Sequence, residues 1–143
     1  MTRLRRASVI AALSLLASAC TTRNAPVTPK SLLVGKWKCG TQISTYSEGS
    51  QKTIDLPETI MEFFGDGRYT STNTRLAHRG TYELVSNDQI SFRIRDANDP
   101  KVVGISGTNH FGLTPDRLRI TTPTRGDTTP NSPKLTETTC TRL

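Results

Sequence analysis

Histidine and cysteine, on which many catalytic and metal sites depend, are scarce in this sequence of 143 residues. It holds two histidines, three cysteines and one tryptophan, and 6% of its residues are aromatic. His78 and His110 stand far apart, and neither belongs to a zinc-binding motif such as H-E-x-x-H. We therefore expect no bound metal, no cofactor and no enzyme activity.

Motifs of hydrolases and nucleotide-binding enzymes are also missing. Residues 104–107 read Gly-Ile-Ser-Gly, which lacks the spacing of the G-x-S-x-G nucleophile elbow. Glu58 and Glu62 would share one face of an expected strand, about 13 Å apart. The sequence has no glycine-rich phosphate loop. A small hydrolase is therefore only the third reading of the function.

The excess of positive charge is small once the N-terminus is set aside. The whole chain carries 19 basic and 12 acidic residues, a net charge of +7. Three of the basic residues, Arg3, Arg5 and Arg6, belong to the first nineteen positions, so residues 20–143 carry a net charge of +4. This balance does not indicate a nucleic-acid partner.

No apolar run is long enough for a membrane-spanning helix, which needs about 20 residues. The main apolar stretch, residues 7–16, follows three arginines and precedes the small residues 17–19. This order is typical of a secretory signal peptide and assigns residues 1–19 to one. A buried N-terminal helix is the alternative.

The signal is followed by Cys20, and residues 16–20 read Leu-Ala-Ser-Ala-Cys. This stretch resembles the lipobox of bacterial lipoproteins, although Ala17 stands where the family prefers leucine. The resemblance implies cleavage before Cys20, a diacylglycerol thioether on its sulfur and an acyl chain on its new amino group. The alternative is an ordinary signal cleaved after Ala19, which would leave Cys20 as a free thiol. For a Gram-negative source, which is an assumption, the resemblance implies from Thr21, in place of aspartate, that the protein lies at the outer membrane and faces the periplasm.

Residues 20–31 form an expected tether between this anchor and a folded domain. The eleven residues after Cys20 include two prolines and three threonines and show no apolar periodicity. Fully extended, they reach about 36–40 Å. A domain covering residues 32–143 would therefore stay close to the membrane surface.

Lipidation of Cys20 would leave two cysteines, Cys39 and Cys140. An even number in an exported chain predicts a disulfide. It would join the first and last expected strands, and closing so long a loop contributes up to about 4.7 kcal/mol in the chain-entropy model. The alternative is a pair of reduced, buried cysteines.

After residue 31 the pattern is that of short strands separated by Gly, Asn, Asp and Pro. The clearest alternation is in residues 89–95, where Ile90, Phe92 and Ile94 alternate with polar residues. We expect an all-β fold, an antiparallel meander of about eight strands that forms a closed barrel, with a sandwich as the alternative. The expected strands are 32–39, 41–46, 59–64, 68–76, 80–85, 89–95, 102–111, 117–122 and 134–142, and residues 47–57 are expected to be a loop.

Two short motifs suggest a family. Gly35-Lys36-Trp37 resembles the Gly-x-Trp opening of lipocalin-like domains, and residues 63–69 with 80–82 resemble a pattern of small lipocalin-like bacterial lipoproteins. The resemblance covers residues 32–143. It implies that Gly35 and Trp37 close one end of the barrel, with Trp37 under a basic residue of the last strand, for which Arg142 is the candidate.

Four arginines, Arg93, Arg95, Arg117 and Arg119, alternate with apolar residues and should point outward. In meander order a single strand separates the two pairs, so we expect one basic patch. Such a patch would bind anionic lipid headgroups, lipopolysaccharide phosphates or an acidic envelope protein. The alternative is a solvated strand face.

Together these features predict a lipid-anchored, non-enzymatic envelope protein that binds a protein or a small ligand. An accessory subunit of an outer-membrane assembly or secretion complex is the alternative. Because a small barrel can be filled by its own side chains, we expect a protein partner rather than carriage of a hydrophobic molecule.

Overall fold

The computed structural model describes residues 27–47, 50–123 and 133–143. The expected signal peptide, Cys20 and most of the expected tether lie outside these residues. The described elements are α1 (Pro29–Leu33), β1 (Gly35–Ser47), β2 (Ser50–Asp55), β3 (Thr59–Phe63), β4 (Arg68–Thr72), β5 (Ala77–Leu84), β6 (Gln89–Ala97), a 3₁₀ turn η1 (Pro100–Val102), β7 (Ser106–Leu113), β8 (Arg117–Pro123) and β9 (Pro133–Arg142).

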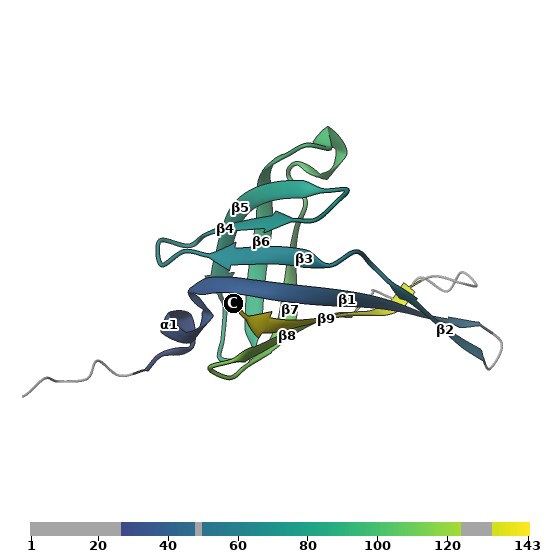
Figure 1. Ribbon diagram of the computed structural model, residues 1–143, viewed down its shortest axis with the longest axis horizontal. Coiled ribbons are helices and arrows are strands. Elements are labelled where there is room, and N and C mark those ends of the chain that lie inside the picture. The colour runs from purple at the N-terminus through teal and green to yellow at the C-terminus, as the bar shows by residue number, and fades with distance from the viewer. Residues whose placement is uncertain (1–26, 48–49, 124–132) are drawn as a thin grey trace, which may run out of the picture.

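The strands form a closed barrel, which confirms the expected fold (Figure 1). Each strand from β3 to β9 pairs antiparallel with the next one in sequence, and β1 pairs with β3 on one side and with β9 on the other. The barrel therefore has eight strands, β1 and β3 to β9. Closure leaves these strands without the free edges that promote aggregation.

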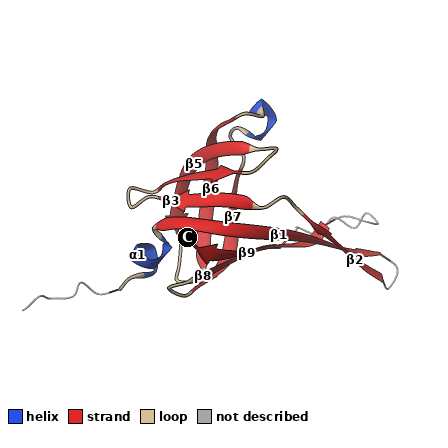
Figure 2. Ribbon diagram, in the orientation of Figure 1, coloured by secondary structure: helices blue, strands red, loops and turns tan. Residues whose placement is uncertain are grey.

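The strand β1 is longer than the barrel needs. Its first part, residues 35–39, pairs with β3, whereas residues 42–47 pair with β2. The resulting hairpin extends past the barrel (Figure 2). Residues 47–57 were expected to be a loop because their polar sequence shows no buried face, and all six residues of β2 are indeed exposed. Pairing with β1 makes this segment a strand, through the backbone ladder and through exposed side-chain hydrogen bonds such as that from Nε2 of Gln42 to Asp55 at 2.9 Å.

A short helix replaces the beginning of the first expected strand. Thr28 caps α1, since its side chain accepts a hydrogen bond from the Ser31 amide, and the Ser31 hydroxyl accepts one from the Thr28 amide. Pro29 occupies the first turn, where its missing amide proton costs nothing. The helix therefore takes residues 29–31 from the expected tether, and it buries Leu33 against the barrel.

The disulfide expected between Cys39 and Cys140 is present, with the two sulfur atoms 2.08 Å apart. The two cysteines are opposite each other in the pairing of β1 with β9. The bond therefore joins the first and last barrel strands where the sheet closes. Both residues belong to the core, which also contains Leu33, Trp37, Phe63, Tyr69, Tyr82, Ile90, Phe111, Leu118 and Ile120.

Candidate functional site

Side chains fill the barrel at one end only. At the other end the interior holds a cavity of about 470 Å³. The barrel is therefore not filled throughout by its own side chains, and the possibility of a filled barrel was the ground for expecting a protein partner rather than a small ligand. Inward positions around the cavity carry several small polar residues, such as Thr41, Ser71 and Thr138, which occupy less volume than aliphatic or aromatic side chains.

The filled end is closed by Trp37, which is fully buried. Its indole Nε1 donates a hydrogen bond of 2.8 Å to the carbonyl oxygen of Leu33, at the end of α1. The guanidinium of Arg142, from the end of β9, lies 4.3 Å from the centre of the indole ring, a cation–π contact. Helix, first strand and last strand thus meet at one side chain, in the arrangement that the lipocalin-like resemblance implies.

Hydrogen bonds fix the position of Arg142 over this ring. Its Nε donates to the carbonyl of Pro115 at 2.6 Å, its Nη1 to that of Val34 at 3.0 Å, and its Nη2 to that of Leu32. Gly35 is required beside it, because its φ is +130° and a Cβ at this position would lie 2.8 Å from Nη1.

One wall of the cavity is apolar. Phe92 and Ile94 come from β6, Ile105 from the segment before β7, and Ile120 from β8. Met61 of β3 adds a flexible thioether. Ile105 is 55% exposed, which places it where the cavity meets solvent.

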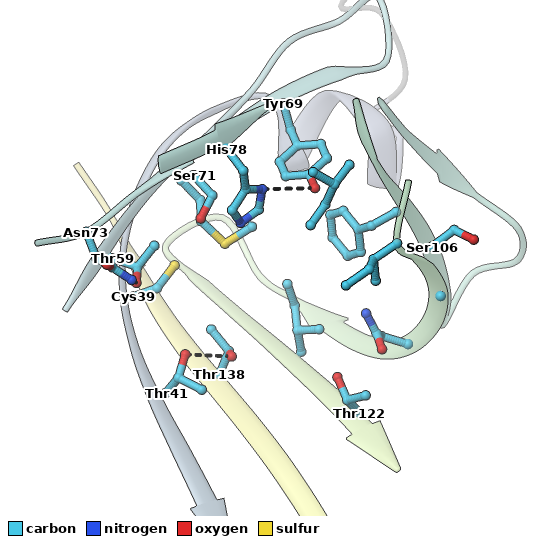
Figure 3. Close-up of a pocket in the computed structure, with 17 residues that line it drawn as sticks. Cys39, Thr41, Thr59, Tyr69, Ser71, Asn73, His78, Ser106, Thr122 and Thr138 are labelled. Carbon is cyan, nitrogen blue, oxygen red and sulfur yellow. Dashed lines mark hydrogen bonds between the residues drawn. The ribbon is translucent and has the colours of Figure 1, made fainter. Parts of the chain in front are cut away.

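Polar side chains of β3, β4 and β5 and the turns beside them line another wall (Figure 3). Ser71 lies directly opposite His78 in the pairing of β4 with β5. The hydroxyl of Tyr69 lies 3.4 Å from Nδ1 of His78. Asn73 donates from Nδ2 to the Thr59 hydroxyl at 3.2 Å. This wall therefore combines hydroxyl, imidazole and amide groups.

The cavity is electrically neutral. Burial lowers the pKa of His78 below its usual value of 6.5, and it raises the pKa of Tyr69 to about 12. Both rings are therefore uncharged near pH 7. Within the described part of the chain, no Lys, Arg, Asp or Glu lines the cavity.

The four arginines of the expected basic patch are all exposed, but the structure does not bring them together. Arg93 and Arg95 lie on β6, and Arg117 and Arg119 lie on β8, with β7 between them as expected. The two pairs occupy different levels of the barrel wall, and a single four-arginine patch is therefore absent.

Strand register is the reason for this separation. Arg93 is opposite Ser106 near the start of β7, whereas Arg119 is opposite Gly112 near its end. Six residues of strand separate these two positions, about 20 Å along β7. Arg119 also pairs with Glu137 of β9, with 2.5 Å between Nη2 and Oε2. Alternation predicted the outward direction of the arginines but carried no information about their level.

The two histidines lie in different surroundings. His78 lines the cavity, whereas His110 is on the outer surface with its Nδ1 3.7 Å from a carboxylate oxygen of Asp88. The Ser86 hydroxyl bonds to Asp88 at 2.7 Å and lowers the pKa of that carboxyl. Serine and histidine thus both face the aspartate, which is not the Ser–His–Asp order of a hydrolytic triad. Within the described ranges, no three His, Cys, Asp or Glu residues are placed to share a metal ion.

Fold and site together define a closed, eight-stranded antiparallel barrel with one plugged end and a neutral cavity at the other. A scan of the sequence against models of known protein families finds no match, and a search of curated proteins finds none either. Over the described ranges, no helix has the length and apolar character needed to cross a bilayer.

Sequence reasoning missed the cavity residues, above all Ser71 and His78. Each stands at an inward position of an alternating strand, between residues that face outward. Polar residues at such positions were the available signal, because a filled barrel would carry larger apolar side chains there.

Proposed function

We propose that this protein is a lipid-anchored protein of the bacterial envelope that binds a small molecule in its barrel. The observation that carries the proposal is the cavity of about 470 Å³, which falls in the range of small-molecule sites, about 300–1,000 Å³. Its mixture of an apolar wall and a few polar groups is typical of such sites.

The proposed anchor is Cys20, on the sequence evidence of the signal peptide and the lipobox. Several acyl chains hold a protein at a membrane far longer than one chain does, since each buried methylene contributes about 0.8 kcal/mol. The disulfide between Cys39 and Cys140 supports an exported location, because such bonds persist in oxidising compartments. The outer membrane, on its periplasmic side, is the proposed location.

A test of ligand binding needs a variant that fills the cavity without disturbing the sheet. Gly107 is suitable, since it lines the cavity opposite Phe92 and a Cβ placed there meets no atom within 4 Å. Gly112 is the matched control: it lies on the same strand, is exposed, and also has open space for a Cβ.

The probe is N-phenyl-1-naphthylamine, an uncharged dye whose fluorescence rises in apolar sites. It would be titrated into a Cys20→Ala form of the full chain, which avoids detergent. We expect the parent and Gly112→Phe to bind it, and Gly107→Phe to bind more than about tenfold more weakly, because the phenyl ring would occupy space that the dye needs; tenfold in affinity corresponds to about 1.4 kcal/mol. Equal binding by all three forms, or no binding by the parent, would contradict the proposal.

A protein partner is the second candidate, and the hairpin of β1 and β2 favours it. In the described sheet, β2 pairs with β1 alone, so its other edge can accept a strand from another protein. An accessory role in an envelope complex would use this edge. A photo-crosslinker at Thr53 should then capture the same protein repeatedly in intact cells, whereas one at Glu83, an exposed position on β5, should not.

A further inference from the structure

We propose that the cavity selects an uncharged ligand with an apolar body and a hydrogen-bonding edge, and that Ser71 and His78 bind this edge. The inference rests on the proposed binding function and adds the chemical class of the ligand. It is carried by the charge of the lining, by the Ser71 hydroxyl and the second ring nitrogen of His78, which have no hydrogen bond to the described residues, and by the apolar wall.

The lining disfavours charged ligands. No formal charge lines the cavity among the residues described, and the two titratable rings there are neutral near pH 7 for the reasons given above. A carboxylate or ammonium group entering this space would lose its water without gaining an opposite charge, which is costly. The chemistry therefore disfavours fatty acids and amines and favours amides, alcohols and similar neutral molecules.

Several polar groups of the cavity already have partners. The side chain of Asn73 donates to Thr59 and accepts from the backbone amides of Arg75 and Leu76, so it holds the turn after β4. The hydroxyls of Thr41 and Thr138 lie 2.9 Å apart and bond to each other, as Figure 3 shows. These side chains stabilise the wall and have less capacity for a ligand.

Ser71 and His78 differ from these groups. Ser71 is 6% exposed, and its hydroxyl has no hydrogen bond to any part of the chain that the structure describes. His78 uses Nδ1 toward the Tyr69 hydroxyl, and in Figure 3 its other nitrogen points into the cavity. Because Ser71 and His78 are cross-strand neighbours, they present one hydroxyl and one imidazole nitrogen side by side. Such a pair suits a group with both a donor and an acceptor, as in an amide.

The apolar wall completes the site. The Phe92 ring packs edge-on against Tyr69, with ring centroids 5.1 Å apart and an angle of 73°, and this contact holds it in place at the cavity. Ile94 and Ile120 line the same space. A ligand with its polar edge at Ser71 would have these side chains available for its apolar body.

The test uses four probes that share one apolar body: naphthalene, 2-naphthamide, 2-naphthoate and 2-naphthylmethylammonium. Their own fluorescence reports binding to the Cys20→Ala full chain. We expect 2-naphthamide to bind most tightly. It should exceed naphthalene by about ten- to hundredfold, the range for two net hydrogen bonds that contribute about three- to tenfold each, and it should exceed both charged probes by more.

Variants then locate the polar edge. Ser71→Ala and His78→Phe should each lower the affinity for 2-naphthamide by about three- to tenfold while leaving that for naphthalene equal or higher. Ser91→Ala is the matched control, because Ser91 stands between the inward-facing Ile90 and Phe92 on β6 and so points outward. It should change neither affinity. Unchanged folding of each variant is checked by circular dichroism.

The outcomes separate this inference from the proposed function. If 2-naphthoate binds as tightly as 2-naphthamide, or if the amide and naphthalene bind equally, the ligand class is wrong while binding in the barrel stands. If Ser71→Ala and His78→Phe both keep the preference for the amide, the polar edge is wrongly placed. If no naphthalene probe binds and Gly107→Phe does not alter dye binding, the proposed function fails.

Discussion

At the scale of single residues, Trp37 brings together three parts of the chain that are distant in sequence. It donates to the end of α1, it packs under Arg142 of β9, and its own strand opens the barrel. A side chain that is fully buried at such a junction contributes both apolar area and close packing.

Replacing Trp37 tests whether its indole stabilises the plugged end of the barrel. We expect Trp37→Ala to lower the free energy of unfolding by about 3–5 kcal/mol, the usual cost of removing a large aromatic from a core. Urea denaturation would measure it. Val85→Ala, at a position 56% exposed, should change stability by less than about 0.5 kcal/mol. A loss of less than about 1 kcal/mol for Trp37→Ala would contradict the role of the indole as the plug.

His78 should make stability depend on pH in a defined direction. Burial lowers its pKa in the folded protein below 6.5, so the unfolded chain binds a proton more readily. The stability linked to this residue is therefore complete above pH 6.5 and is lost as the pH falls from 6.5 toward the lowered pKa. Tyr69, with a pKa of about 12, stays neutral over this range.

Melting temperatures between about pH 7 and pH 5 would test this sign. The wild type should lose stability on acidification more steeply than His78→Phe, which has no proton to gain at this position. His110→Gln, at a histidine that is 55% exposed, should follow the wild type. An equal slope for the wild type and His78→Phe would show that His78 does not contribute.

Residue-level prediction from the sequence succeeded for the cysteines, by chemistry, and for Trp37, by resemblance to lipocalin-like domains. Cys39 and Cys140 were paired by their even number, and Trp37 was identified from a short motif. The prediction of one basic patch failed for the arginines. Alternation shows which face of a strand a side chain lies on, whereas the distance between the two arginine pairs along the barrel wall depends on strand register. Register is set by turn geometry and by packing of the whole sheet.

At the scale of elements, the contact between β1 and β9 closes the barrel, and the disulfide lies in it. We expect Cys39→Ser and Cys140→Ser to destabilise the protein equally, by about 2–5 kcal/mol, since each breaks the same bond. The double variant should lose no more than either single one. Wild-type protein unfolded in the presence of a thiol reductant should match all three. Clearly different losses for the two single variants would mean that the bond is not formed.

Two elements, α1 and β2, escaped prediction for physical reasons. The helix has five residues, too few to show an apolar period, although Thr28, Pro29 and Ser31 form a recognisable capping signal. The strand β2 buries neither face, so its sequence resembles a loop. The strand β2 depends on pairing with β1, which its own residues do not reveal.

At the scale of the whole molecule, the barrel could be predicted from period-two alternation, hairpin turns and the distant cysteines. The cavity was missed, although small polar residues at inward positions, such as Ser71, were a signal for it. Whether eight strands enclose a filled core or a hollow depends on the summed volume of the inward side chains. Alternation shows only which side chains point inward.

The proposed anchor would determine where the whole molecule is found in the cell. We expect Cys20→Ala to move the protein from the membrane fraction to the soluble fraction, because a thioether to diacylglycerol cannot form without the sulfur. Thr21→Ala keeps that sulfur and should remain with membranes. Immunoblots of fractionated cells would measure how each variant distributes between the membrane and soluble fractions. Membrane retention of Cys20→Ala would rule out this anchor.

Both ends of the described chain emerge beside the plugged end of the barrel, where α1 and the end of β9 meet (Figure 1). A short tether attached there would orient the cavity end of the barrel toward the aqueous space and away from the lipid leaflet. A ligand would then enter the cavity from water rather than directly from the bilayer. A reporter fused after residue 143 would sit at the base and leave the entrance clear.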